Sequence, residues 1–379
     1  LVATVVATGL VLRGYDGAGA LAFAATLVGT GMVFASVSLV TGQIATSSRV
    51  ASGLALIVLG VSFILRAVGD VGNGVLSWYS PLGWGQAIRA FAGERWWVLG
   101  VQLVATAALV SLAGWLSGRR DFGAGMLPQR SGRPEAGPML SSTLGLAVRL
   151  QRGAWFGWLA GVTVISVFYG VITDEVDQMV TDNPELEAFF AQAGVGSITD
   201  SFLATAALMI GLLASGYMVS AVLRIRSEEV AVRADPLLAT PTPRRTWASS
   251  HLVVAAIGTV ILLAVAGSGL GLGAAIVTGD WDRVSQMGGA ALVVGPAVAV
   301  LGALAFALCC AAPRWSLLAW VGVAVAVAVG LLGETLGLSQ WVRNLSPLEH
   351  VPPFPAAPLA STPLVILAVV AVVLSQRGS

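Results

Sequence analysis

Residues 248–277, ASSHLVVAAIGTVILLAVAGSGLGLGAAIV, contain no acidic and no arginine side chain. A run of this length and apolarity is what a helix needs to cross the roughly 30 Å hydrocarbon core of a bilayer. Over the whole chain, 56% of the 379 residues are hydrophobic and 10% are charged, too few to cover a soluble domain with polar side chains. The sequence therefore predicts an all-α polytopic integral membrane protein in the cell membrane.

Similar apolar runs recur along the chain, with boundaries uncertain by a few residues. The predicted spans are 20–43, 51–69, 97–116, 153–173, 201–223, 248–277, 288–312, 315–335 and 362–377. A partial run occupies 1–12 and is too short to span. Because the chain starts inside this run, we expect it to be the remainder of a longer sequence.

The composition excludes several kinds of chemistry. All 20 basic residues are arginine, so the phosphate-binding pattern GxxxxGK[ST] cannot occur. Neither an HExxH helix nor a GxSxG elbow is present, and the two histidines have no cysteine or histidine beside them. We predict no catalytic residue, no metal site and no cofactor in this chain, and the net charge of +1 gives no indication of a nucleic-acid partner.

Loop charge predicts the orientation. If segments 117–152 and 224–247 face the cytoplasm, that side holds 14 of the 20 arginines but 5 of the 19 acids. The opposite side includes an acidic run from Asp174 to Glu187. Excess arginine on the cytoplasmic side is the normal bias of membrane proteins, so we adopt this topology.

A weak internal repeat runs through the chain. WYSPLGWG at 78–85 resembles NLSPLEHV at 344–351, which pairs Ser80 with Ser346 at an offset of 266. At the same offset Asp16 meets Asp282, and the order of spans corresponds. We therefore predict two parallel repeats of six transmembrane helices, related by an axis along the membrane normal, with the first repeat incomplete in this chain.

The predicted domains follow from this repeat. Residues 1–116 are the C-terminal part of the first transmembrane half, and residues 153–379 are the second half. Residues 117–152 lie between them, with a Gly-, Pro- and Arg-rich linker followed by an interfacial helix at 141–152. The alternative for 141–152 is that it is simply the basic flank of the next span.

The segment 226–247, RSEEVAVRADPLLATPTPRRTW, interrupts the apolar pattern with helix-start signals. Ser227 followed by Glu228 and Glu229 favours a helix start, because the helix dipole stabilises acids in the first turn. Asp235 before Pro236 predicts an N-cap followed by proline at the first helical position.

Thr242 before Pro243 is the same kind of helix-start pattern, and we expect the next membrane helix to begin there. The segment should thus form two short helices that meet at a bend. Leu237 and Leu238 should be exposed near the bend unless something covers them, and a leucine pair between charged shoulders suits docking of a soluble protein. A membrane-surface helix pair without a partner is the alternative.

The same residues carry a family resemblance. SEEVAVRADPLLATPTPRRTW at 227–247 resembles the coupling-helix region of permease subunits of ATP-binding-cassette exporters, in the polyketide-antibiotic branch of the tetronasin-resistance type. SPLGWGQAIRAFAGERWW at 80–97 and GLAVRLQRGAWFGW at 145–158 are similar to that branch as well. In the coupling region the family has a glycine-rich sequence, whereas this chain has Val230, Ala231 and Val232.

The resemblance implies an exporter of hydrophobic or amphipathic compounds, such as antibiotics, drugs or lipids, that works by alternating access. Its partners would be separate ATP-binding-cassette ATPase subunits, two copies for a doubled permease, which bind ATP and Mg²⁺. The residues implied to couple to them are Glu228, Glu229, Arg233, Asp235, Pro236, Leu237, Leu238 and Arg245.

By the same resemblance, a substrate path would lie between the halves, lined by their second and fifth spans. We expect Phe63, Phe202, Met209 and Tyr217 to line it, because methionine and aromatic side chains repack readily around apolar ligands. Plain helix packing or lipid contact is the alternative for each of them.

Two other classes of protein compete with this interpretation. An ion-coupled secondary transporter would explain the repeat without an ATPase, and Asp70 and Glu334, near the ends of corresponding spans, would be its ionisable groups. A membrane-embedded enzyme is more distant. Dependence of transport on ATP or on a proton gradient separates the first two classes.

Overall fold

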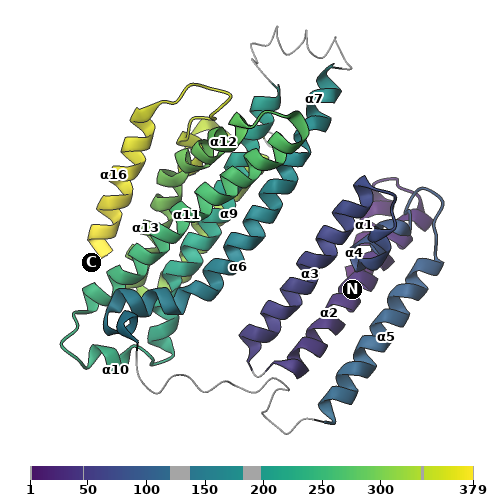
Figure 1. Cartoon of the computed structure of the whole chain (residues 1–379), viewed down its shortest axis with the longest axis horizontal. Helices are drawn as coiled ribbons and strands as arrows, with labels where there is room; N and C mark the ends of the chain where they lie inside the picture. Colours follow the sequence, from purple (N-terminus) through teal and green to yellow (C-terminus); the bar gives the residue numbers. More distant parts are fainter. Residues whose placement is uncertain (1, 46, 120–136, 182–197, 334–336, 379) are drawn as a thin grey trace. The chain divides into compact units, whose positions relative to one another are not determined.

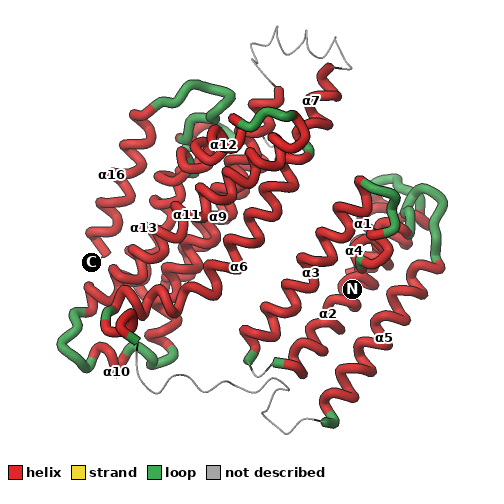
Figure 2. The backbone as a smooth tube through the Cα atoms, in the orientation of Figure 1, coloured by secondary structure: helices red, strands yellow, loops and turns green. Residues whose placement is uncertain are grey.

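The computed structural model describes residues 2–45, 47–119, 137–181, 198–333 and 337–378. Every regular element in these ranges is helical (Figure 2). The helices form two compact units, Leu1–Pro134 and Glu135–Ser379. The boundary between the units falls inside the segment 117–152 that the sequence predicts to link two halves.

Unit 1 is built around one long helix, α2, that contacts four others (Figure 1). A polar contact joins two of these helices, because the buried amide of Gln102 donates to the Thr30 hydroxyl at 3.0 Å. The elements of unit 1 are α1 (Val2–Leu12), α2 (Gly17–Ile44), α3 (Ser48–Val71), the 3-10 turn η1 (Leu76–Tyr79), α4 (Pro81–Ala87) and α5 (Trp97–Ser117).

Unit 2 is larger, and its long helices run side by side in Figure 1, with α10 at the opposite end from α7 and α12. Its elements are η2 (Pro138–Ser141), α6 (Thr143–Val171), α7 (Thr173–Thr181), α9 (Ile198–Val230), α10 (Asp235–Leu238), α11 (Arg244–Thr278), α12 (Asp282–Val293), α13 (Gly295–Ala311), η3 (Pro313–Leu318), α14 (Ala319–Leu332), α15 (Gln340–Arg343), η4 (Pro347–His350) and α16 (Ser361–Gly378).

Helix α9 is the core of unit 2. It packs against α6, α11, α13 and α14, and its buried residues point in every direction around the axis. A helix that is apolar all round can satisfy its surface only by being surrounded, which explains its central place. Leu203, Ile210 and Val222 are among its buried side chains.

Glycines bring α11 close to its two neighbours. A methyl group on Gly271 would overlap the Arg283 carbonyl oxygen in α12, and one on Gly273 would overlap the Val167 carbonyl oxygen in α6. One turn earlier, a methyl group on Gly267 would overlap the Met287 carbonyl oxygen in α12, and one on Gly269 would press against the Thr163 and Val167 side chains in α6. Small residues permit this backbone approach between helices that lipid does not drive together.

Eight of the described helices are long and apolar enough to cross a membrane, and they correspond to the first eight predicted spans. The last predicted span, 362–377, forms the shorter apolar helix α16, and the partial run 1–12 forms α1. Composition alone locates these helices because each is a continuous apolar run.

Two details differ from the sequence prediction. Helix α6 begins at Thr143 and runs without a break to Val171, so residues 143–152 are continuous with the span and do not form a separate helix. The span predicted at 288–312 is divided into α12 and α13 at Val294, because Pro296 stands in the first turn of α13, where its missing N–H is tolerated.

Each unit has a buried serine before a short proline-led helix. The Ser80 hydroxyl accepts from the Leu82 amide and donates to the Ser62 carbonyl oxygen of α3 at 2.6 Å. Ser346 is equally buried in front of η4, where Leu348 packs against Gly211 of α9. These turns close the ends of the neighbouring helices.

Candidate functional site

Helix α9 ends later than the sequence suggests, and this changes the role of its acids. Glu228 and Glu229 lie in the last turn of α9, so the helix start predicted at Ser227 is wrong. The helix continues because Ile225 is buried and because Arg224 and Glu228 form a helix-stabilising pair four residues apart. We call residues 224–247 the corner.

A tight turn stops α9. The Val232 amide donates to the Glu229 carbonyl at 2.9 Å and the Arg233 amide donates to the Glu228 carbonyl at 3.0 Å, which is a Schellman turn. Val232 occupies its left-handed position with φ 58°. Glycine is usual there, since a left-handed residue with a side chain costs about 1–2 kcal/mol.

Glu228 is held between two arginines. The residue is 4% exposed, and its carboxylate accepts from Arg224 Nε at 2.9 Å and from Arg233 Nε at 2.7 Å. The first arginine precedes it on α9 and the second follows the turn. The hydrogen bond to Glu228 and its charge raise the pKa of the Arg233 guanidinium, so Arg233 stays charged.

Glu229 forms a second clamp that joins two helices. Its carboxylate forms an ion pair with Arg226 of α9, with 3.5 Å between Oε2 and the arginine Nη1. It also forms an ion pair with Arg244, the first residue of α11. The loop 231–243 is therefore fixed at both ends by glutamates. Sequence reasoning named the two acids but missed Arg224, Arg226 and Arg244, although the four-residue spacing of Arg224 and Glu228 was a visible signal.

The short helix inside the corner starts one residue earlier than predicted. Asp235 is the first residue of α10 and Pro236 the second, and the N-cap is Ala234, which offers no side-chain hydrogen bond. The predicted Asp235 cap is therefore wrong. Ala234 is buried and its carbonyl accepts from Leu238 at 2.9 Å, so packing of this residue sets the start.

The start of α11 also differs from the prediction. Its N-cap is Pro243, and the Thr242 hydroxyl bonds the Thr240 hydroxyl at 2.9 Å instead of capping the helix. The corner thus contains one short helix between two long ones, and not two short helices at a bend. Asp235, Pro236 and Arg245 are exposed on it.

The leucine pair of α10 does not project outward. Leu237 and Leu238 are half-buried and pack against the hydrophobic core of unit 2, so the chain itself covers them. The large hydrophobic side chains that the corner exposes are Val230, at 64%, and Val232, at 62%. Local sequence could not show this, because the direction of a side chain on α10 depends on how the helix packs against the hydrophobic core of unit 2.

A buried polar contact joins α6 to the first turns of α11, next to the corner. The Gln151 side-chain amide of α6 donates to the His251 carbonyl oxygen of α11 at 3.2 Å and lies 3.2 Å from Nδ1 of the same histidine. The His251 ring meets Trp247 edge-on at 5.4 Å between centroids, and all three side chains are buried. The start of α11 is thereby fixed to α6.

Comparison with known proteins gives the family. The family model described as the C-terminal domain of multidrug efflux system permease Rv1217c matches residues 140–379. The multidrug efflux system permease protein Rv1217c of Mycobacterium tuberculosis (strain ATCC 25618 / H37Rv) is 37% identical over 375 residues, which cover 98% of this chain and 68% of that protein. The chain belongs to the Rv1217c permease family. It is a multi-span membrane protein.

Three of the predicted pathway residues lie on α9 of the permease and pack within unit 2. Tyr217 is buried with its ring edge-on to Trp158 at 6.4 Å between centroids, and Phe202 stacks on Tyr169 at 6.4 Å. Met209 is half-buried against the same core. Phe63 is half-buried on α3 of unit 1. A pathway role for these four residues stays a prediction.

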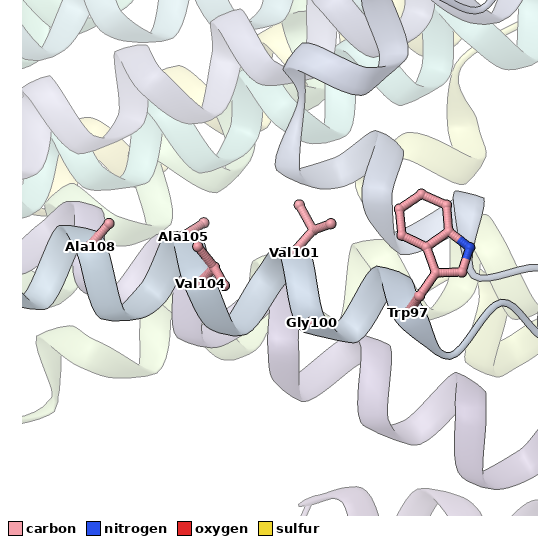
Figure 3. Close-up of a pocket in the computed structure, with 6 residues that line it drawn as sticks. All are labelled: Trp97, Gly100, Val101, Val104, Ala105 and Ala108. Carbon is pink, nitrogen blue, oxygen red and sulfur yellow. The ribbon is translucent and has the colours of Figure 1, made fainter.

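An apolar hollow of about 480 Å³ follows one face of α5 (Figure 3). The residues that line it are Trp97, Gly100, Val101, Val104, Ala105 and Ala108. They recur every three or four positions, so they share one side of the helix. The four predicted pathway residues are not among them, and the only side-chain polar atom drawn there is the Trp97 indole nitrogen.

Of the two ionisable residues that the ion-coupled alternative would use, the structure describes Asp70. Asp70 accepts from Arg66 Nε at 3.1 Å and from the Ser77 hydroxyl at 2.8 Å, and it is exposed. Glu334 lies outside the described residues. Asp70 is therefore engaged in a surface ion pair of the permease, which an i,i+4 spacing readily forms.

Proposed function

We propose that this chain is the membrane-spanning permease subunit of an ATP-driven exporter of hydrophobic or amphipathic compounds. Separate ATP-binding-cassette ATPase subunits, two per permease, would dock at the corner and drive alternating access. The similarity to a multidrug efflux system permease of Mycobacterium tuberculosis supports the export of drugs. Membership of the polyketide-antibiotic branch is part of the same proposal and rests on the motifs at 80–97 and 227–247.

The observation that carries the proposal is the double clamp of the corner. Glu228 and Glu229 each bind two arginines, and these pairs tie the end of α9 to the turn and to the start of α11. A lever that transmits force must not deform, and charge-assisted bonds around a buried carboxylate hold their geometry strongly. Because α9 is also the central helix of unit 2, a push on the corner would reach the core directly.

The division of labour follows from the composition. A chain without lysine cannot build the lysine-dependent phosphate loop, so ATP and Mg²⁺ would be bound by the partner. Closure of the partner subunits around ATP would move the corner and switch packed helix bundles between two states. The permease would contribute binding and movement but no bond-making residue.

Local packing supports the proposed repeat of two six-helix halves. In unit 1, α2 contacts α3, α4 and α5; in unit 2, α13 contacts α14, η4 and α16 in the same order along the chain. Asp16 caps α2 and Asp282 opens α12 at corresponding positions. Ser80 and Ser346 are both buried before a proline-led turn.

The test is transport by the purified complex in sealed vesicles. In vesicles whose outer face carries the corner and the ATPase, we expect a lipophilic drug to accumulate inside when ATP is added outside. A proton gradient alone should give no transport. Glu228→Gln should slow ATP-driven transport more than Glu349→Gln, which removes a carboxylate paired with Arg343 at a distant turn. Transport that follows the proton gradient and ignores ATP would replace this proposal by the ion-coupled transporter.

A further inference from the structure

The corner presents a small apolar surface at the turn that ends α9. Val230 and Val232 are exposed there, whereas Leu237 and Leu238 turn toward the core. The two valines are separated by Ala231, which is exposed too, and we call these three residues the tip. Neighbouring exposed apolar side chains in a charged loop are candidates for contact with a partner.

The backbone at this tip is held in an unfavourable state. Val232 adopts φ 58°, and a β-branched residue in the left-handed region is a genuine outlier. Glycine at this position would remove the strain, because it adopts positive φ readily. Strained residues that persist in this way gather at functional contacts, which directs attention to the outward side of Val232.

Charge around the tip has one predominant sign. Arg233, Arg244 and Arg245 are exposed, while Glu228 and Glu229 are turned inward and bound by arginines. Asp235 is the one exposed acid that the sequence places between 224 and 247. A partner that meets this surface must therefore offer acidic groups around an apolar centre, because charge complementarity selects partners and speeds association.

We propose that the Val230–Val232 tip, and not the leucine pair of α10, enters the ATPase subunit, in a groove with an apolar floor and an acidic rim. Val230 and Val232 fill the floor, and Arg233, Arg244 and Arg245 meet the rim. This inference rests on the proposed function and adds the contact residues and the chemistry of the groove. Leu237 and Leu238 serve instead to hold α10 on the core, so their substitution would unfold the corner before it tested docking.

The first test measures affinity between the full-length permease in detergent micelles and the ATPase subunit that co-purifies with it, identified by its GxxxxGK[ST] sequence. Val230→Asp and Val232→Asp are expected to weaken binding about tenfold or more, since apolar anchors dominate such interfaces. Thr240→Asp is the matched control, because Thr240 is exposed on the same corner and is similar in size. It should change the affinity less than about twofold.

The second test separates docking from folding. Val232→Gly relieves the backbone, so its melting temperature should equal or exceed that of the unaltered permease, while its affinity for the ATPase subunit falls several-fold. A residue with a merely structural role would not give this opposite pair of results. Arg245→Glu should weaken binding most at low salt, because exposed charges are screened as ionic strength rises.

The third test locates the contact directly. A photo-crosslinking residue at position 230 or 232 should give an adduct with the ATPase subunit, and one at Thr240 should not. If adducts form from Thr240 and not from the tip, or if the aspartate variants bind as the unaltered permease does, the tip is not the contact, although the exporter proposal stands. If the unaltered permease binds no ATPase at all, both proposals fall.

Discussion

Glu228 illustrates how one residue depends on its neighbours. A carboxylate in the last turn of a helix opposes the helix dipole, and burial adds a desolvation penalty. Arg224 and Arg233 offset both effects by binding one carboxylate oxygen each. Because the two arginines come from either side of the turn, loss of the carboxylate charge loosens the link between α9 and the corner.

We expect Glu228→Gln to lower the free energy of unfolding by about 2 kcal/mol, since two charge-assisted hydrogen bonds become neutral or are lost. Denaturant-induced unfolding of the permease in detergent micelles measures this change. Asp235→Asn is the control, because Asp235 is exposed and forms no ion pair with any described residue. Equal stability of the two variants would show that the clamp does not hold the corner.

At the scale of elements, α11 determines how unit 2 is assembled. Its glycines approach α12 on one side and α6 on the other, so the three backbones lie closer than larger side chains would allow. The same helix is fixed at its start by the Glu229–Arg244 pair and by the contact of Gln151 with His251. Any movement of the corner must therefore carry α11 with it.

Gly273→Leu should prevent the close approach of α6 and α11, because the added side chain would meet the Val167 carbonyl oxygen and the Gly170 backbone. We expect a loss of about 3 kcal/mol or more of stability, as found when packed interiors are overfilled. Thermal unfolding in detergent checks this. Gly289→Leu provides the comparison, since Gly289 is exposed on α12 and an added methyl group would meet no neighbouring atom. It should change the free energy of unfolding by less than about 1 kcal/mol.

At the scale of the whole molecule, unit 2 contains its own core. The cluster of buried hydrophobic residues around α9 lies entirely within 162–367, and its helices close around that centre. In unit 1, by contrast, α3 has few buried residues, so its helices have less core of their own. The two units should accordingly differ in their ability to fold alone.

Residues 137–379 expressed without unit 1 should keep their helical content and unfold in one cooperative thermal transition. Residues 2–119 expressed alone should give a broad transition or aggregate in detergent, because the surfaces of α3 and α5 stay largely exposed. Circular dichroism and size-exclusion chromatography distinguish these outcomes. A sharp transition for residues 2–119 together with an aggregated 137–379 would contradict this assignment of the core.

The sequence by itself determined the spans, because crossing a bilayer requires a continuous apolar run that any window along the chain reveals. It also located the corner, since charge and proline stand out against such runs. The position of Pro236 in a short helix followed from local rules to within one residue.

Only the tertiary structure decided which corner side chains face outward. Glu228 and Glu229 end a helix and do not begin one, because burial of Ile225 and pairing with arginines extend α9. Leu237 turns inward because α10 packs against the hydrophobic core of unit 2, and Val232 is exposed in the left-handed turn that ends α9. Hydropathy belongs to a segment, whereas the direction of a side chain depends on the distant elements that surround it.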